Sequence, residues 1–254
     1  MVVDLRKYDS HVRTQAAYMC NAEAFLGLLE NLANQQGPEC YTEYSRAFSH
    51  IKAVLATLPH GYVPSSNDVI FDRAANVENI YAQVYARSIT NGPSGLVHET
   101  QFRTDVFPLN FSKLTWVKYL PQFKSGFPEA AVLNTVDKIK EHLDKGIPVI
   151  VGCGIDPVTA DNAYNVIRET NDRNHAILIV GYTDTDFIFK NTNGIYWGDN
   201  GYGYLLLDSM KDRENLDGFS LASKPDFPSL YWWRKNKILA WLVKSIGFDI
   251  DFSS

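Results

Sequence analysis

Residues 175–204 read HAILIVGYTDTDFIFKNTNGIYWGDNGYGY, and this stretch decides the fold. Two short runs inside it, at 176–182 and 186–190, are rich in β-branched and aromatic residues, which favours β-strands. The polar residues at 183–185 between the two runs fit the turn of an antiparallel hairpin. The stretch therefore predicts two paired strands, followed by a run of glycines and aromatic residues.

The predicted hairpin brings together two polar residues, His175 and Asn191. A turn centred near residue 183 puts them opposite each other, since each is eight positions from that centre. An asparagine amide can accept a hydrogen bond from one imidazole nitrogen and leave the other nitrogen to face a cleft. We therefore expect Asn191 to orient His175 as a general base.

Helices are predicted mainly before the strands. The apolar positions of a first helix, which starts near Cys20, are Phe25, Leu28, Leu29 and Leu32. Those of a second helix are Tyr44, Ala47, Phe48, Ile51, Leu55 and Leu58, and those of a third are Val132, Val136, Ile139 and Leu143. Residues 61–127 are rich in Pro, Gly, Asn and Ser, and we interpret them as loops with one or two strands.

Further strands are predicted in the C-terminal half, at 147–152 and 203–207. Helices first and strands later favour an α+β fold, with a helical N-terminal lobe and an antiparallel β C-terminal lobe. The boundary between two such lobes is a natural place for a cleft.

Charge and hydropathy exclude some classes of partner. The net charge is −5 and the pI is near 5.7, and no long block of Lys and Arg occurs, so we expect no nucleic-acid partner. No stretch approaches the length of an apolar membrane span, so we expect no membrane partner. The three cysteines are too few and too scattered for a disulfide framework or a CxxC metal site.

A general base of this kind needs a nucleophile, and Cys20 fits because it lies at the start of the first helix. The positive end of the helix and an adjacent imidazolium both favour a thiolate, so we expect the Cys20 pKa to lie below the free value of about 8.5. The backbone N–H of Cys20 and the side-chain amide of Gln15 can stabilise the oxyanion formed on attack. Glu23 is interpreted as a first-turn acidic residue, and Cys40 and Cys153 as structural thiols.

The chain resembles the papain family of cysteine peptidases. The stretch VDLRKYDSHVRTQ at 3–15 is similar to the mature N-terminus of that family, in which the Gln belongs to the oxyanion hole. The other similar motifs are Asn174-His175-Ala176, Lys190-Asn191-Thr192 and the run Gly194, Trp197, Gly198, Asn200, Gly201 and Tyr202. The resemblance implies that Cys20, His175, Asn191 and Gln15 are the catalytic residues of a papain-like thiol peptidase.

Some positions depart from the family pattern. Only four residues separate Gln15 from Cys20, one fewer than is usual in the family. Asn21 and Glu23 stand where the family usually has aromatic residues, and Asn193 stands where it has a Trp over the His–Asn pair. A small amide at 193 would leave that hydrogen bond in a higher dielectric, so we expect His175 to be held less firmly. We therefore expect weak turnover unless Trp197, Trp232 or Trp233 takes over the shielding.

The resemblance implies a single papain-like domain over 1–254, with a helical lobe at about 15–125 and a β lobe at about 126–254 plus the N-terminal strand. We expect a monomer that hydrolyses peptide bonds of a peptide or protein substrate, with no metal and no organic cofactor. Alternatives are a thiol hydrolase or transferase acting on isopeptide or other amide bonds, and an inactive or weakly active papain-fold binding protein. The resemblance also implies an exported or lysosome-like location and an inhibitory pro-segment outside this chain. The aromatic tail at 208–254 is expected to pack on the sheet.

Overall fold

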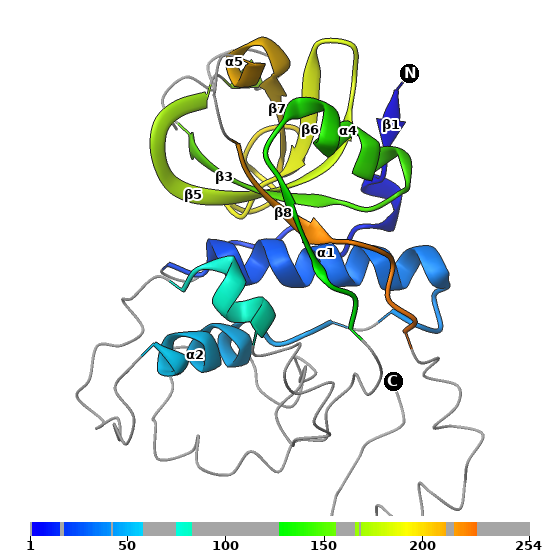
Figure 1. The fold of residues 1–254 in the computed structure, drawn as a ribbon, viewed down its shortest axis with the longest axis vertical. Coiled ribbons are helices and arrows are strands. Elements are labelled where there is room, and N and C mark those ends of the chain that lie inside the picture. Colours follow the sequence, from blue (N-terminus) through cyan, green and yellow to red (C-terminus); the bar gives the residue numbers. More distant parts are fainter. Residues whose placement is uncertain are drawn as a thin grey trace, which may run out of the picture.

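The computed structural model describes residues 2–15, 18–41, 43–57, 75–82, 127–155, 166–167, 169–211 and 216–227. In Figure 1 the sheet lies on one side of the long helix α1, and α2 lies on the other. The helices are α1 (Cys20–Gln36), α2 (Arg46–Ala56), α4 (Val136–Asp144), α5 (Leu207–Lys211) and a further helical segment at 77–82, besides the 3-10 helix η1 (Arg6–Tyr8). The aromatic tail beyond residue 227 lies outside the described residues.

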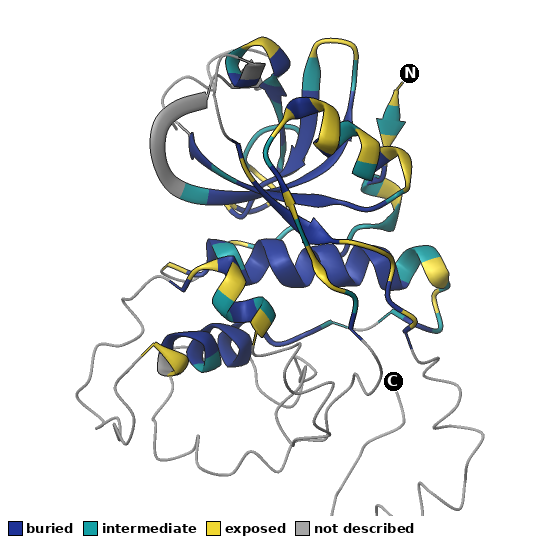
Figure 2. Ribbon diagram, viewed as in Figure 1, coloured by how far each residue is buried: buried dark blue, intermediate teal, exposed yellow. Residues whose placement is uncertain are grey.

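Helix α1 is the central element of the fold, and it begins at Cys20 as expected. Of its 17 residues 13 are buried, which is typical of a helix that is covered on all sides rather than amphipathic. Figure 2 shows this burial along most of its length, whereas α4 exposes its outer side. The ring of Phe25 packs against Tyr81, Phe127 and Phe219, so α1 joins the helical segment at 77–82 to the sheet.

The strands form one sheet in the order β2-β8-β3-β5-β6-β7-β4, and β1 pairs with β5 outside this path. Their bounds are β1 Val3–Asp4, β2 Ala130–Leu133, β3 Val149–Ile155, β4 Val166–Ile167, β5 Glu169–Tyr182, β6 Asp186–Lys190, β7 Tyr202–Leu206 and β8 Asp217–Leu221. All pairings are antiparallel except that of β4 with β7. A Cβ on Gly181 would lie 2.3 Å from the Val3 carbonyl oxygen, so glycine is needed where β1 crosses β5.

The β5-β6 hairpin forms where the sequence predicted it, but the predicted register is wrong. Tyr182 pairs with Phe187 and Leu178 with Lys190, whereas a centre at 183 would pair Lys190 with residue 176. The register shifts between Ile179 and Gly181, and the carbonyl of the residue between them accepts a hydrogen bond from the Leu5 N–H at 2.8 Å. The bulge therefore forms where the N-terminal segment joins the hairpin.

The third predicted helix starts later than its apolar spacing indicates. Residues 130–133 form β2, and the side chain of Val132 is 74% exposed rather than packed with the helix. Thr135 caps α4, since its hydroxyl accepts a hydrogen bond from the Lys138 N–H. This cap fixes the helix start four residues after Val132, which the spacing alone could not indicate.

The expected loops and strands at 61–127 are described only in part. The described residues 75–82 are helical at 77–82 rather than extended, and the rest of that segment up to 126 lies outside the described residues. None of the helices in the described ranges combines the length and the apolar character that a membrane crossing requires.

Candidate active site

The nucleophile candidate Cys20 is the first residue of α1 and is 9% exposed. Burial raises the pKa of its thiol above the usual value, and the backbone N–H groups of Ala176, Asn21 and Cys20 itself only partly oppose the rise. The expected low pKa is therefore wrong for this structure, because burial outweighs the helix N-terminus. The effect of the Ala176 N–H also places the thiol beside β5, next to His175.

The base candidate His175 lies in β5 and is hydrogen-bonded to Asn191. Its Nε2 lies 2.9 Å from Asn191 Oδ1, and the Thr192 N–H donates to the same oxygen at 2.8 Å. The Thr192 N–H can only donate, which identifies its partner as the amide oxygen. Because that oxygen can only accept, Nε2 carries the proton and Nδ1 is free to accept one. Burial lowers the pKa of His175, and the bond to Asn191 offsets this only in part.

The two side chains meet although their backbones are not paired. His175 pairs with Cys153 of β3, and Asn191 follows the last residue of β6. Asn191 is held by its N–H, which donates to the Gly201 carbonyl at 2.9 Å. Gly201 has a φ of 89°, and a Cβ on it would lie 2.4 Å from Val12, so this corner requires glycine.

Gln15 lies at the same corner. Its N–H donates to the Thr192 carbonyl at 2.8 Å, and the Thr192 hydroxyl donates to its side-chain oxygen. The carbonyl end of the amide is thus held, and the NH₂ end remains as a donor. The shortened connection to Cys20 includes Tyr18, which has a φ of 55°, an uncommon conformation for a bulky residue.

Asn191 is shielded from solvent although position 193 carries an asparagine instead of a tryptophan. Asn193 is exposed and pairs with Thr14, but Asn191 itself is only 1% exposed. The ring of Trp197 packs on Phe189 of β6, with ring centroids 5.8 Å apart. Asn191 is therefore shielded from solvent although position 193 carries a small amide, so the condition of an unshielded pair is not met at its Asn end.

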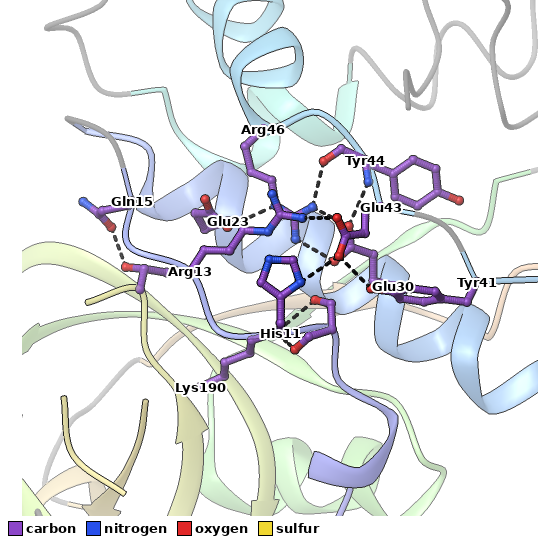
Figure 3. Close-up of polar contacts among 12 residues, drawn as sticks. His11, Arg13, Gln15, Glu23, Glu30, Tyr41, Glu43, Tyr44, Arg46 and Lys190 are labelled. Atoms are coloured by element: carbon purple, nitrogen blue, oxygen red, sulfur yellow. Dashed lines mark hydrogen bonds and ion pairs between the residues drawn. The ribbon is translucent and has the colours of Figure 1, made fainter. Parts of the chain in front are cut away.

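A buried ionic cluster behind the site was missed from the sequence. Glu23 and Glu30, seven residues apart on α1, both bind the guanidinium of Arg46 at the start of α2 (Figure 3). Arg46 Nε donates to Glu23 Oε2 at 3.0 Å, and its Nη2 donates to Glu30 Oε2 at 2.6 Å. Burial alone would raise the pKa of Glu30, but Arg46 holds it below the usual value. Two acidic residues at helical spacing within an apolar helix were the available signal.

Lys190 fixes the N-terminal segment to β6. Its ammonium donates to the carbonyl of Ser10 at 2.7 Å and to the Ser10 hydroxyl at 3.0 Å (Figure 3). Together with the Gln15 contacts, this bond sets where the segment before Cys20 lies. Within the described ranges, His, Cys, Asp and Glu form no group of three or more that could hold a metal ion.

Comparison with known proteins gives matches of three kinds. Residues 74–202 match the model of the Peptidase_C39 like family. A viral cathepsin from Spodoptera litura multicapsid nucleopolyhedrovirus is 39% identical over 92 residues, which is 34% of this chain and 25% of the viral protein. The chain thus matches about a quarter of the length of that relative.

Two of the similar solved structures are proteases. Xylellain, a cysteine protease from Xylella fastidiosa, has a TM-score of 0.62 at 19% identity, over 87% of this chain and 85% of that chain. Procathepsin L2 from Tenebrio molitor larval midgut has a TM-score of 0.59 at 18% identity, over 86% of this chain and 66% of that chain. Likeness at this level of identity shows a shared fold.

Proposed function

The chain belongs to the Peptidase_C39 like family and has the α+β papain-like fold, and from this premise we propose that it is a cysteine peptidase that hydrolyses peptide bonds through an acyl-enzyme. The observation that carries the proposal is the 2.9 Å bond between His175 Nε2 and Asn191 Oδ1, beside a thiol at the start of α1. We assign Cys20 as nucleophile, His175 as base, Asn191 as its orienting partner and Gln15 as an oxyanion donor.

The protonation states define the first step. Burial raises the pKa of Cys20 and lowers that of His175, so the resting pair is a neutral thiol and a neutral imidazole. His175 Nδ1 takes the thiol proton as sulfur attacks the substrate carbonyl, which makes His175 a general base rather than half of a preformed ion pair. Asn191 stabilises the resulting imidazolium by accepting from Nε2.

The remaining steps use the same groups. The backbone N–H of Cys20 and the Gln15 NH₂ donate to the oxyanion. His175 returns the proton to the leaving amine, the acyl group stays on sulfur, and a water deprotonated by His175 then hydrolyses the thioester. The sulfur is regenerated as a thiol.

Turnover of a fluorogenic peptide library tests the proposal. We expect Cys20→Ser to abolish hydrolysis and Asn191→Ala to lower kcat/KM about thirtyfold, or about 2 kcal/mol, the value of a buried hydrogen bond to a charged group. Cys40→Ser is the matched control, since that thiol is buried away from His175 beside Phe227, and it should retain full activity. Hydrolysis that persists in Cys20→Ser would overturn the assignment.

One observation favours a second candidate, a binding protein of this fold with little or no activity. Cys20 is 9% exposed, and the pKa shifts of Cys20 and His175 both oppose a reactive thiolate. Unchanged binding of a peptide ligand by wild type and Cys20→Ser, without cleavage by either, would support this candidate.

An inhibitory pro-segment is a further part of the proposal. The similar insect structure is a procathepsin by name, which supports a pro-segment that inhibits this chain. The test is the rate of peptide hydrolysis by this chain with and without a synthetic pro-segment peptide, and the rate should fall when the peptide is added.

A further inference from the structure

A small cavity lies behind the candidate active site, where α1, α2, the N-terminal segment and β6 meet. Glu23, Arg46, Lys190, Asn191 and Thr192 are among the residues that line it. It offers about 10 Å³ for the centres of water molecules, which is room for one water. Asn191 therefore lines the same cavity as Glu23 and Arg46, two members of the ionic cluster of α1 and α2 that Figure 3 shows.

Only one end of the Asn191 side-chain amide makes hydrogen bonds to described residues. Its Oδ1 accepts from His175 and from the Thr192 N–H, while its Nδ2 is buried and no described residue accepts a hydrogen bond from it. A buried donor without an acceptor is costly, and native proteins satisfy such groups with protein or ordered water. The Thr192 N–H already holds the oxygen of this amide, and an acceptor for Nδ2 would add to that hold and help to keep Oδ1 turned toward His175.

Glu23 is the carboxylate among the residues that line the same cavity. One of its carboxylate oxygens accepts from Arg46 Nε at 3.0 Å, and no described residue donates to the other. Arg46 is already held by two hydrogen bonds to Glu30, so the cluster carries two carboxylates for one guanidinium. Glu23 therefore has accepting capacity left over, and it lines the same cavity as the buried donor of Asn191.

We propose that Glu23 is a positioning residue of the site, and that one water in this cavity accepts from Asn191 Nδ2 and donates to the Glu23 carboxylate. This inference rests on the proposed function. The water bridge locks the Asn191 amide with Oδ1 toward His175, and the locked amide holds His175 in the Nε2–H tautomer that leaves Nδ1 free for Cys20. Glu23 acts through Asn191 and does not touch substrate.

The test is nitrogen-15 NMR of histidine-labelled protein, which reads the His175 tautomer without any need for activity. We expect one Nε2–H tautomer in the wild type and a mixture of tautomers in Glu23→Met, which has a similar shape but no acceptor. Glu23→Gln keeps a carbonyl acceptor and should restore the single tautomer. Glu30→Gln is the matched control, because Glu30 binds the same Arg46 but does not line the cavity, and it should lose stability with the tautomer unchanged.

Kinetics give a second readout. We expect Glu23→Met to lower kcat about tenfold, the effect of one weakened hydrogen bond, with KM unchanged within about twofold. A single tautomer in folded Glu23→Met, or a mixture in Glu30→Gln, would overturn the proposal. If peptide hydrolysis is absent but the tautomer still responds to Glu23→Met, the proposed function fails and the role of Glu23 stands.

The wild-type protein supplies a test that needs no folded variant. The Asn191 Nδ2 protons should show a nuclear Overhauser effect to a long-lived water resonance. Absence of this contact, in a spectrum where other buried waters are seen, would exclude the bridge.

Discussion

At the scale of single residues, the reactivity of the candidate site depends on the protonation states of Cys20 and His175. The helix N-terminus and the three backbone N–H groups around Cys20 favour a thiolate, but burial opposes it more strongly. Burial also disfavours the imidazolium of His175. In the proposed mechanism, Cys20 therefore becomes reactive only when a base removes its proton during attack.

The pH dependence of alkylation follows from these two shifts. The thiolate is the reactive form, so a raised Cys20 pKa predicts that its iodoacetamide labelling rises with pH through a value above that of an ordinary cysteine, about 8.5. A preformed ion pair would instead give a labelling plateau that extends to about pH 5. Rates for Cys20 measured by mass spectrometry from pH 5 to 10 distinguish the two, and a plateau at acid pH would contradict the neutral pair.

At the scale of elements, α1 connects Cys20, the proposed nucleophile, to the rest of the molecule. It begins at Cys20, and its Glu23 and Glu30 bind Arg46 of α2. Lys190 and Gln15 join the N-terminal segment to β6 and to the residues after it. The position of Cys20 relative to His175 is therefore set by buried polar contacts as well as by apolar packing.

Replacing Arg46 should strongly destabilise the fold, because the change would leave two buried carboxylates unpaired. We expect Arg46→Met to lower the free energy of unfolding by about 3–5 kcal/mol, as for other broken buried ion pairs. Urea denaturation measures the change. Arg6→Met is the control, since Arg6 pairs with the partly exposed Asp4 and Asp199, and it should cost about 1 kcal/mol or less. Equal losses in the two variants would show that the cluster is not important for stability.

The bounds of helices and strands could be predicted from the sequence more accurately than the way these elements pair and pack. The start of α1 and the bounds of β6 agree with the prediction because local apolar patterns define them. The register of β5 with β6 could not be predicted, because the bulge depends on a hydrogen bond from Leu5, far away in the chain. Arg46 was missed for a similar reason, since only the fold brings a guanidinium to two acids on another helix.

The site residues show the same limit. Sequence spacing predicted that His175 and Asn191 meet, and their side chains do meet at 2.9 Å, although the backbone register behind that prediction is wrong. The pKa direction of Cys20 was wrong because exposure cannot be read from a helix start. Residues that the fold brings together shield Asn191 from solvent. The residue type at position 193 alone could not indicate this shielding.

At the scale of the whole molecule, the sheet packs on one side of α1 and α2 on the other (Figure 1), so stability depends on groups buried between them. Arg46 keeps the folded-state pKa of Glu30 below its usual value, against the effect of burial. A lowered folded pKa adds stability above the unfolded-state value of about 4.3, and this contribution is lost as the pH falls through the folded pKa.

Acid unfolding should reveal this contribution. We expect the free energy of unfolding to fall as the pH drops below about 4.3, and to fall less steeply in Glu30→Gln, which has no proton to gain at this position. Urea titrations at a series of pH values measure both slopes. Identical slopes would mean that Glu30 does not contribute to the acid sensitivity.

The central claim is that Cys20 is a nucleophile activated by His175. Incubation with a peptidyl epoxysuccinyl probe, followed by mass spectrometry of the digested protein, tests it most directly. We expect one adduct, on Cys20, formed much faster than any on Cys40 or Cys153 and strongly slowed in folded His175→Ala. Equal labelling of the three cysteines, or a Cys20 adduct that forms at the same rate without His175, would contradict activation of Cys20 by His175.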